Sequence, residues 1–124
     1  MALSKEYIAG LFDGEGSVGL YRDKRTVGVY KPSLRIELRD EVGTVRLLGD
    51  LCEEYGVKLS RSKRGTCVFS VYREEALKAF IGDILPFTRL KTAQLVLLDA
   101  WLETKTFGYR FHQLLKNHKQ RRIK

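Results

Sequence analysis

The chain has 124 residues, of which 44% are hydrophobic, so it is long and apolar enough to form the core of one domain. This composition excludes global disorder, and the two cysteines, Cys52 and Cys67, are too few for a disulfide framework. The net charge of +8 at neutral pH favours a polyanionic partner, most often a nucleic acid.

The first predicted element is a helix over residues 5–13 or 5–14. Ser4 is suited to cap its N-terminus, and Gly14 and Gly16 are suited to end it. Gly10 and Gly14 are four residues apart and therefore share one face of the helix. Because glycine has no side chain, a second helix can approach this face closely. The acids Asp13 and Glu15 lie at the C-terminal end, where a helix carries partial negative charge.

Two strands follow, over residues 17–22 and 29–39, joined by a turn at 23–27. In the first strand Val18 and Leu20 alternate with polar or small residues, and Pro32 in the second indicates an edge or a bend. The second strand has the clearest two-residue periodicity of the chain. Its apolar set is Leu34, Ile36 and Leu38, and its polar set is Lys31, Ser33, Arg35, Glu37 and Arg39.

A second helix is expected between Asp40, as N-cap, and Gly56, as C-terminal stop. Its apolar stripe comprises Val42, Val45, Leu48, Leu51 and Cys52. A second hairpin is predicted over residues 58–63 and 66–72, with Phe69 and Val71 facing inward.

Three helical segments complete the chain, over residues 74–85, 92–103 and 109–117. The first stops before Pro86, and the second buries Leu95, Leu98 and Trp101. The order of elements predicts a single α+β domain over residues 1–124, in which helices cover one face of an antiparallel sheet. Residues 116–124 are basic, and we expect them to form a solvated tail. Gly14, Gly16 and Gly19 spell a dinucleotide-binding pattern, but the helix precedes the strand, so no nucleotide cofactor is expected.

Residues 8–16 read Ile-Ala-Gly-Leu-Phe-Asp-Gly-Glu-Gly and closely resemble the LAGLIDADG motif of homing endonucleases, with conservative differences only. The chain carries one copy of this motif. The resemblance extends over nearly the whole chain in the order of its elements. It implies an αββαββα core with a saddle-shaped sheet, plus a C-terminal helix. It also implies a homodimer, with an interface expected at Ala9, Gly10, Asp13 and Gly14.

The activity implied by the resemblance is site-specific double-strand cleavage of a long, near-palindromic DNA target, of the kind used in intron homing. The expected cofactor is Mg²⁺ or Mn²⁺, bound by the Glu15 carboxylate and the Gly14 backbone carbonyl. Either DNA phosphates or a second Glu15 from a partner chain would complete the metal's ligands. Such a metal activates water and stabilises the leaving oxygen.

Two further residues are candidates for catalysis by the same resemblance. Lys91 matches a lysine that reaches the active site in single-motif members, where it stabilises the phosphate or helps to activate water. Asp40 lies where the family often has a polar residue that orients water, with Arg39 as the alternative if the register slips by one. An acid at Asp40 departs from that pattern, and a simple helix cap is an equal interpretation. Asp13 is expected to be structural.

In the family the sheet lies over the major groove of DNA, so its exposed face should carry the DNA-binding residues. Arginine suits guanine and glutamate can accept from cytosine. The expected set is Ser17, Tyr21, Lys31, Ser33, Arg35, Glu37, Arg39, Arg61, Lys63, Ser70 and Tyr72. We also expect Val68 to be exposed on this face.

A second interpretation stays open, in which the chain is a catalytically silent DNA-binding regulator or an RNA-binding intron maturase. The presence of Glu15 and Lys91 favours the enzyme. The sequence contains no signal-peptide hydrophobic region and no apolar run as long as a membrane span, so an intracellular protein of the cytoplasm or an organelle is expected, without membrane contact.

Overall fold

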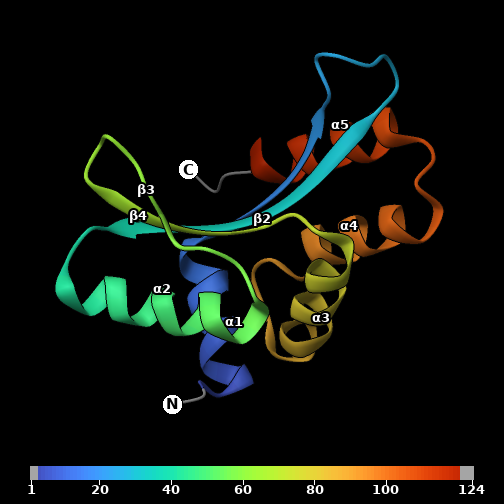
Figure 1. The fold of residues 1–124 in the computed structure, drawn as a ribbon. Helices are drawn as coiled ribbons and strands as arrows, with labels where there is room; N and C mark the ends of the chain where they lie inside the picture. Colours follow the sequence, from blue (N-terminus) through green and yellow to red (C-terminus); the bar gives the residue numbers. More distant parts are fainter. Residues whose placement is uncertain (1–2, 121–124) are drawn as a thin grey trace.

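The computed structural model describes residues 3–120 and has the predicted α+β architecture (Figure 1). The elements in chain order are α1 (Lys5–Glu15), β1 (Gly16–Arg22), β2 (Tyr30–Arg39), α2 (Val42–Tyr55), β3 (Ser60–Arg61), β4 (Thr66–Val71), α3 (Glu74–Ile84), the 3-10 turn η1 (Leu85–Phe87), α4 (Thr92–Thr104) and α5 (Gly108–Gln120). Residues 121–124 of the expected basic tail lie outside the described residues, and residues 116–120 continue α5.

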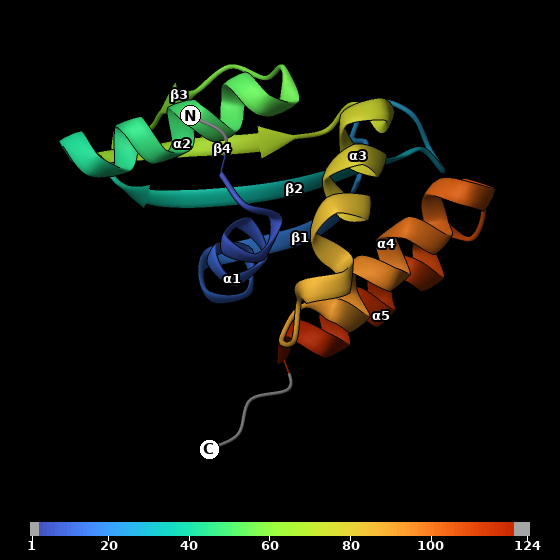
Figure 2. The same cartoon turned by 90° about the horizontal axis from the view of Figure 1, so that it is seen from below.

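The four strands form one antiparallel sheet in the order β1-β2-β4-β3. Helices α1, α2 and α3 lie on one side of this sheet, and the tips of both hairpins rise on the other side (Figure 1). The outer face of the sheet is therefore concave between the two tips. The view from below shows that α4 and α5 lie at the β1 side of the molecule (Figure 2). No helix within residues 3–120 has both the length and the apolar character needed to span a membrane.

The core lies between the sheet and the helices. The alternation predicted for β2 is present, because Leu34 and Ile36 are fully buried while Arg35 between them is exposed. Phe80 of α3 packs edge-on against Phe12 of α1, with ring centroids 5.7 Å apart. The C-terminal half of α1 is thereby anchored to the helical layer.

The first helix begins as its sequence predicts, but it continues through Gly14 to Glu15, slightly beyond the predicted end. Ser4 Oγ accepts a hydrogen bond from the Tyr7 amide at 3.1 Å, which is the N-cap interaction. Gly16 ends the helix, and β1 starts at the same residue. A Cβ atom at Gly16 would overlap the Phe12 ring, which is fully buried. Glycine is therefore needed where the chain passes directly from helix to strand.

The start of α2 differs from the prediction. The N-cap is Glu41 rather than Asp40, and the Glu41 amide donates to Thr44 Oγ1 at 3.0 Å. The Asp40 amide instead donates to the Gly65 carbonyl at 2.9 Å, which joins the end of β2 to the second hairpin. Val42, placed on the apolar stripe by its spacing, is 77% exposed because it lies in the first turn, beyond the edge of the core.

One smaller expectation also needs correction. The first strand of the second hairpin is shorter than predicted, since only residues 60–61 pair with β4. Gly56 and Gly65 have positive φ angles, at the end of α2 and in this hairpin, where other residues would be strained. Cys52 and Cys67 are buried free thiols, in agreement with the absence of a disulfide framework.

Candidate active site and nucleic-acid interface

The C-terminal end of α1 carries the predicted metal ligands. Glu15 is the last residue of the helix and is exposed, and Gly14 lies in the last turn, where carbonyl groups lack partners within the helix. Within residues 3–120 no group of three or more His, Cys, Asp or Glu side chains is arranged to hold a metal ion. Glu15 supplies one exposed carboxylate at this end of the helix.

Asp13 binds the segment that precedes α4. Its carboxylate accepts hydrogen bonds from the backbone amides of Arg89 at 2.7 Å, Leu90 at 3.1 Å and Lys91 at 3.0 Å. All three donors lie in the segment that leads into α4, where amide groups lack helical partners. The structural role expected for Asp13 agrees with this arrangement, which leaves the carboxylate little capacity to bind a metal.

Lys91 reaches the same end of α1 with its side chain. Its Nζ donates to the Asp13 carbonyl oxygen at 3.0 Å, and the group is partly buried. The Asp13 carbonyl belongs to the last turn of α1, close in the chain to Glu15. The structure thus brings the ammonium group of Lys91 to the C-terminal turn of α1, which ends in Glu15. The two contacting residues, Asp13 and Lys91, are 78 positions apart in the sequence.

Asp40 lies apart from this group. The strand register pairs Gly16 with Ile36, and Asp40 follows further along, beyond the end of β2. Its carboxylate is 3.6 Å from Arg61 Nε. The helix-cap interpretation of Asp40 is wrong, since Glu41 caps α2, and a catalytic role for Asp40 stays a prediction.

The exposed side chains of β1, β2 and β4 form rows across the outer face of the sheet. The register pairs Ser17 with Arg35 and Arg35 with Ser70, and cross-strand partners share a face. Tyr21 is paired with Lys31 in the same way. The members of the predicted DNA-binding set that lie on this face are Ser17, Tyr21, Lys31, Ser33, Arg35, Glu37, Arg39 and Ser70. Tyr72 follows the end of β4 and is exposed.

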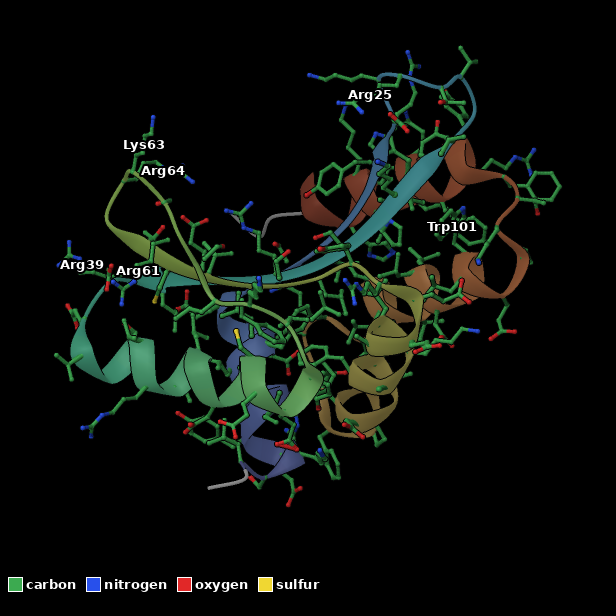
Figure 3. All side chains as sticks on the ribbon, in the orientation of Figure 1. Arg25, Arg39, Arg61, Lys63, Arg64 and Trp101 are labelled. Carbon is green, nitrogen blue, oxygen red and sulfur yellow. The ribbon has the colours of Figure 1, made fainter. Side chains whose placement is uncertain are left out.

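Two residues of the second hairpin depart from the prediction. Arg61 is paired with Cys67, whose side chain is buried, so Arg61 points to the helix side of the sheet and not to the outer face. Val68, expected to be exposed, is only 5% exposed. Lys63 lies with Arg64 at the tip of the hairpin, on the concave side (Figure 3).

Sequence reasoning missed three residues of this surface. Arg25 lies at the tip of the first hairpin (Figure 3). Its position in a basic turn between two predicted strands could have identified it as a DNA-binding candidate. Arg64 and Thr66 both contact the Glu37 carboxylate across the sheet. Their roles depend on the strand register, which periodicity alone does not determine.

The exposed face of α1 has no covering element within the described residues. Gly10 and Gly14 are exposed, and apart from the neighbouring backbone of α1 itself no atom lies within 4 Å of the position that a Cβ would take at either glycine. Tyr7, one turn earlier, is 52% exposed. Ala9 was expected at the same surface, but it is fully buried in the core and offers nothing to a partner. Neighbouring helical residues are about 100° apart around the axis, which turns Ala9 away from the exposed face of Gly10 and into the core.

No family model and no curated protein matches the chain. Solved structures do match it. The homing endonuclease I-CvuI in complex with its target has a TM-score of 0.82 at 16% identity, covering 97% of this chain and 84% of that chain. The archaeal intron-encoded homing endonuclease I-Vdi141I complexed with DNA has a TM-score of 0.74 at 16% identity, covering 97% of this chain and 86% of that chain.

The I-SmaMI LAGLIDADG homing endonuclease bound to cleaved DNA has a TM-score of 0.69 at 15% identity. That match covers 94% of this chain and 41% of the other. Such identities establish a shared fold. The nine-residue motif at the end of α1 and these structural matches agree, and the chain therefore has the fold of the LAGLIDADG homing endonucleases.

Proposed function

We propose that the protein is a site-specific DNA endonuclease that acts as a homodimer with a divalent metal ion, Mg²⁺ or Mn²⁺. The observation that carries this proposal is the arrangement at the end of α1. Gly14 and Glu15 directly follow Asp13, whose backbone carbonyl accepts a hydrogen bond from Lys91 Nζ at 3.0 Å. A carboxylate beside a fixed cation is suited to metal-assisted hydrolysis of a phosphodiester.

The residues present fit a hard divalent cation. Glu15 and the Gly14 carbonyl would hold it, because both offer the oxygen ligands that Mg²⁺ prefers. When bound, the metal supplies an activated water and charge stabilisation for the leaving oxygen. Lys91 contributes a positive charge fixed by its bond to Asp13, and this charge stabilises the phosphate as negative charge develops on it.

A second copy of the chain is the partner that the exposed glycines favour. The face around Gly10 and Gly14 is open, and two such faces related by a two-fold axis can pack backbone to backbone. This packing would place two Glu15 carboxylates near the axis. Each would then serve one strand of a duplex.

Double-stranded DNA fits the outer face of the sheet. The face is concave between the hairpin tips, and Arg25, Lys63 and Arg64 lie at those tips (Figure 3). The net charge of +8 agrees with a polyanionic ligand. Structures of I-CvuI and I-Vdi141I, which have similar folds, contain DNA, and this supports the same ligand class for this chain.

A cleavage selection on a randomised library of duplex DNA, with and without Mg²⁺, tests this proposal. The wild-type protein should enrich one target and cut both strands only with the metal. Glu15→Gln should abolish cleavage and retain binding of the enriched target. Glu6→Gln is the matched control, because it removes the same charge from the exposed first turn of α1. Binding without cleavage by the wild type would support a silent regulator instead, and preferential binding of RNA would support a maturase.

A further inference from the structure

One carboxylate, that of Glu37, lies on the outer face of the sheet near the end of β2. Arg35 Nη2 donates to Glu37 Oε1 at 2.9 Å, from the same strand. Arg64 Nη2 donates to Glu37 Oε2 at 3.2 Å, from the turn of the second hairpin. The Thr66 hydroxyl donates to the same Oε2 from β4. Glu37 thus connects β2 to β4 and to the hairpin tip.

The negative charge of Glu37 is unusual on a surface that is proposed to bind a polyanion. The hydrogen bond from Thr66 is the main cause that lowers the pKa of Glu37, and the nearby guanidinium groups of Arg35 and Arg64 add to it against the opposing effect of burial. The carboxylate is therefore ionised at neutral pH and would repel phosphate. Its acceptor sites are also largely occupied, since a carboxylate accepts about four hydrogen bonds and three donors are already present. Direct reading of cytosine, the role expected from the sequence, would require these donors to leave.

The two arginines remain accessible while Glu37 holds them. The side chains of Arg35 and Arg64 are 43% and 76% exposed, whereas that of Glu37 is 26% exposed. Each guanidinium has five N–H donors, and the bond to Glu37 uses only part of this capacity. The remaining donors can form the bidentate contact to O6 and N7 of guanine. A side chain already held in position loses less conformational entropy when it binds.

The hairpin turn supports the position of Arg64. Ser62 Oγ and Thr66 Oγ1 are 2.6 Å apart, and the Arg64 amide donates to Ser62 Oγ at 3.2 Å. Gly65 has a φ of 80°, a conformation that returns the chain sharply toward β4. Arg64 is therefore held at its backbone by the turn and at its side chain by Glu37.

We propose that Glu37 is a positioning residue that orients Arg35 and Arg64 to read guanines in a double-stranded DNA target. This inference rests on the DNA-binding function proposed above, and it specifies two bases of the DNA target. The target contains guanine at the base pair that faces each of these two arginines. Glu37 acts through the arginines and does not itself contact a base.

A binding selection on randomised duplex DNA tests the inference, with the bound fraction sequenced for each variant. Arg35→Ala and Arg64→Ala first identify the two base pairs concerned, as the positions that lose guanine preference. Glu37→Gln should then reduce guanine preference at both positions by about tenfold, within the range for loss of a good bidentate contact. Its affinity for unrelated duplex DNA should stay equal or rise, because a negative charge is removed from the binding face.

Two further variants make the result specific. Thr66→Val leaves every charge in place and should change the same two positions to a smaller extent. Glu53→Gln removes a carboxylate from the exposed side of α2, on the other side of the sheet, and should change no base preference. Circular dichroism of each variant reports whether the fold is intact.

The possible outcomes separate the inference from the proposed function. If Glu37→Gln loses preference for cytosine at another base pair and keeps both guanines, Glu37 reads a base directly and the inference is wrong. Unchanged preferences in a folded Glu37→Gln protein would also overturn it. If the wild-type protein selects no sequence, the proposed function fails and the inference fails with it.

Discussion

Asp13 and Lys91 bind each other through both backbone and side chain. The Lys91 amide donates to Asp13 Oδ1 at 3.0 Å, and Lys91 Nζ donates to the Asp13 carbonyl oxygen, also at 3.0 Å. The start of α4 is thereby fixed to the end of α1, two residues before Glu15. Lys91 is thus held beside the last turn of α1, which also contains the carboxylate that is proposed to bind metal.

Replacing Asp13 should therefore affect both stability and cleavage. Asp13→Ala leaves three amides without their acceptor, and hydrogen bonds to charged groups contribute about 1.5–3 kcal/mol each. Because the site is only partly buried, we expect a total loss of about 2–3 kcal/mol in the free energy of unfolding. Single-turnover cleavage should fall by at least about tenfold when Lys91 is no longer held. Urea denaturation and cleavage of the selected target measure the two effects.

Lys91→Met provides the control for this prediction. It removes the ammonium group but keeps the backbone amide that Asp13 binds, so cleavage should fall while the free energy of unfolding changes little. Equal losses of stability in the Lys91→Met and Asp13→Ala variants would contradict the proposed division of roles.

Gly16 gives a second prediction, which depends on packing and not on backbone strain. Its φ of −85° is accessible to alanine, but a Cβ would overlap the Phe12 ring. Phe12 is fully buried against Phe80 and cannot move without disturbing the core. Gly16→Ala should therefore cost about 1–3 kcal/mol of stability, as overpacked cores do.

Gly10→Ala is the matched control for Gly16→Ala. No atom lies within 4 Å of the Cβ position at Gly10, and alanine favours a helix interior over glycine by about 1 kcal/mol. The stability of the monomer should therefore rise in this variant. Thermal unfolding at low protein concentration compares the two, and a neutral Gly16→Ala variant would contradict the account of the helix-to-strand junction.

The sequence was sufficient for most elements of the fold because the apolar periodicity was strong. The alternation of Leu34 and Ile36 with charged residues determines which face of β2 is buried, and the packing follows it. The N-cap residue of α2 was harder to predict from the sequence. Asp40 and Glu41 are adjacent acids, and the choice between them depends on the bond from Asp40 to Gly65, a residue of another hairpin.

The site shows the same division between local and long-range information. Glu15 and Lys91 were identified through the motif and the family resemblance. The contact between the Asp13 carboxylate and residues 89–91 spans almost the length of the chain, and no periodicity reports it. Arg61 was assigned to the outer face by counting alternate residues, but a strand of only two residues before a turn shifts that count by one.

Asp83 predicts how stability depends on pH. The Tyr55 hydroxyl donates to Asp83 Oδ2 at 2.7 Å, and Lys5 Nζ is 3.1 Å from the same oxygen. Burial alone would raise the pKa of Asp83, but the bonds from Tyr55 and Lys5 outweigh it and leave the pKa below the usual value of 3.8. The folded state therefore binds this proton more weakly than the unfolded state. The resulting stabilisation is present above about pH 4 and decreases as the pH falls through the folded pKa.

Asp83→Asn should remove this dependence. Its free energy of unfolding should lie below that of the wild type between pH 5 and 7 and approach it below about pH 4. Asp50→Asn, at an exposed position of α2, should leave the pH profile unchanged. Guanidinium denaturation across this pH range measures all three proteins, and parallel profiles for wild type and Asp83→Asn would show that Asp83 does not contribute.

The Gly10→Leu substitution tests the proposed dimer, because it should stabilise the single chain and prevent dimerisation. A Cβ atom at this position has open space around it in one chain, and leucine is a better helix former than glycine by about 0.5–1 kcal/mol. The isolated chain should therefore become more stable. The dimer should be lost, because the side chain occupies the space that the second backbone needs.

Sedimentation at micromolar concentration measures the association of the Gly10→Leu variant, and denaturation at low concentration measures the fold of one chain. Gly43→Leu is the control, since Gly43 is also an exposed helical glycine with nothing within 4 Å of its Cβ position, but on α2. It should keep the dimer and the cleavage activity. A Gly10→Leu protein that stays dimeric and cuts both strands would show that the partner chain docks elsewhere. The proposed packing would then not explain how two Glu15 carboxylates come to lie near a common axis.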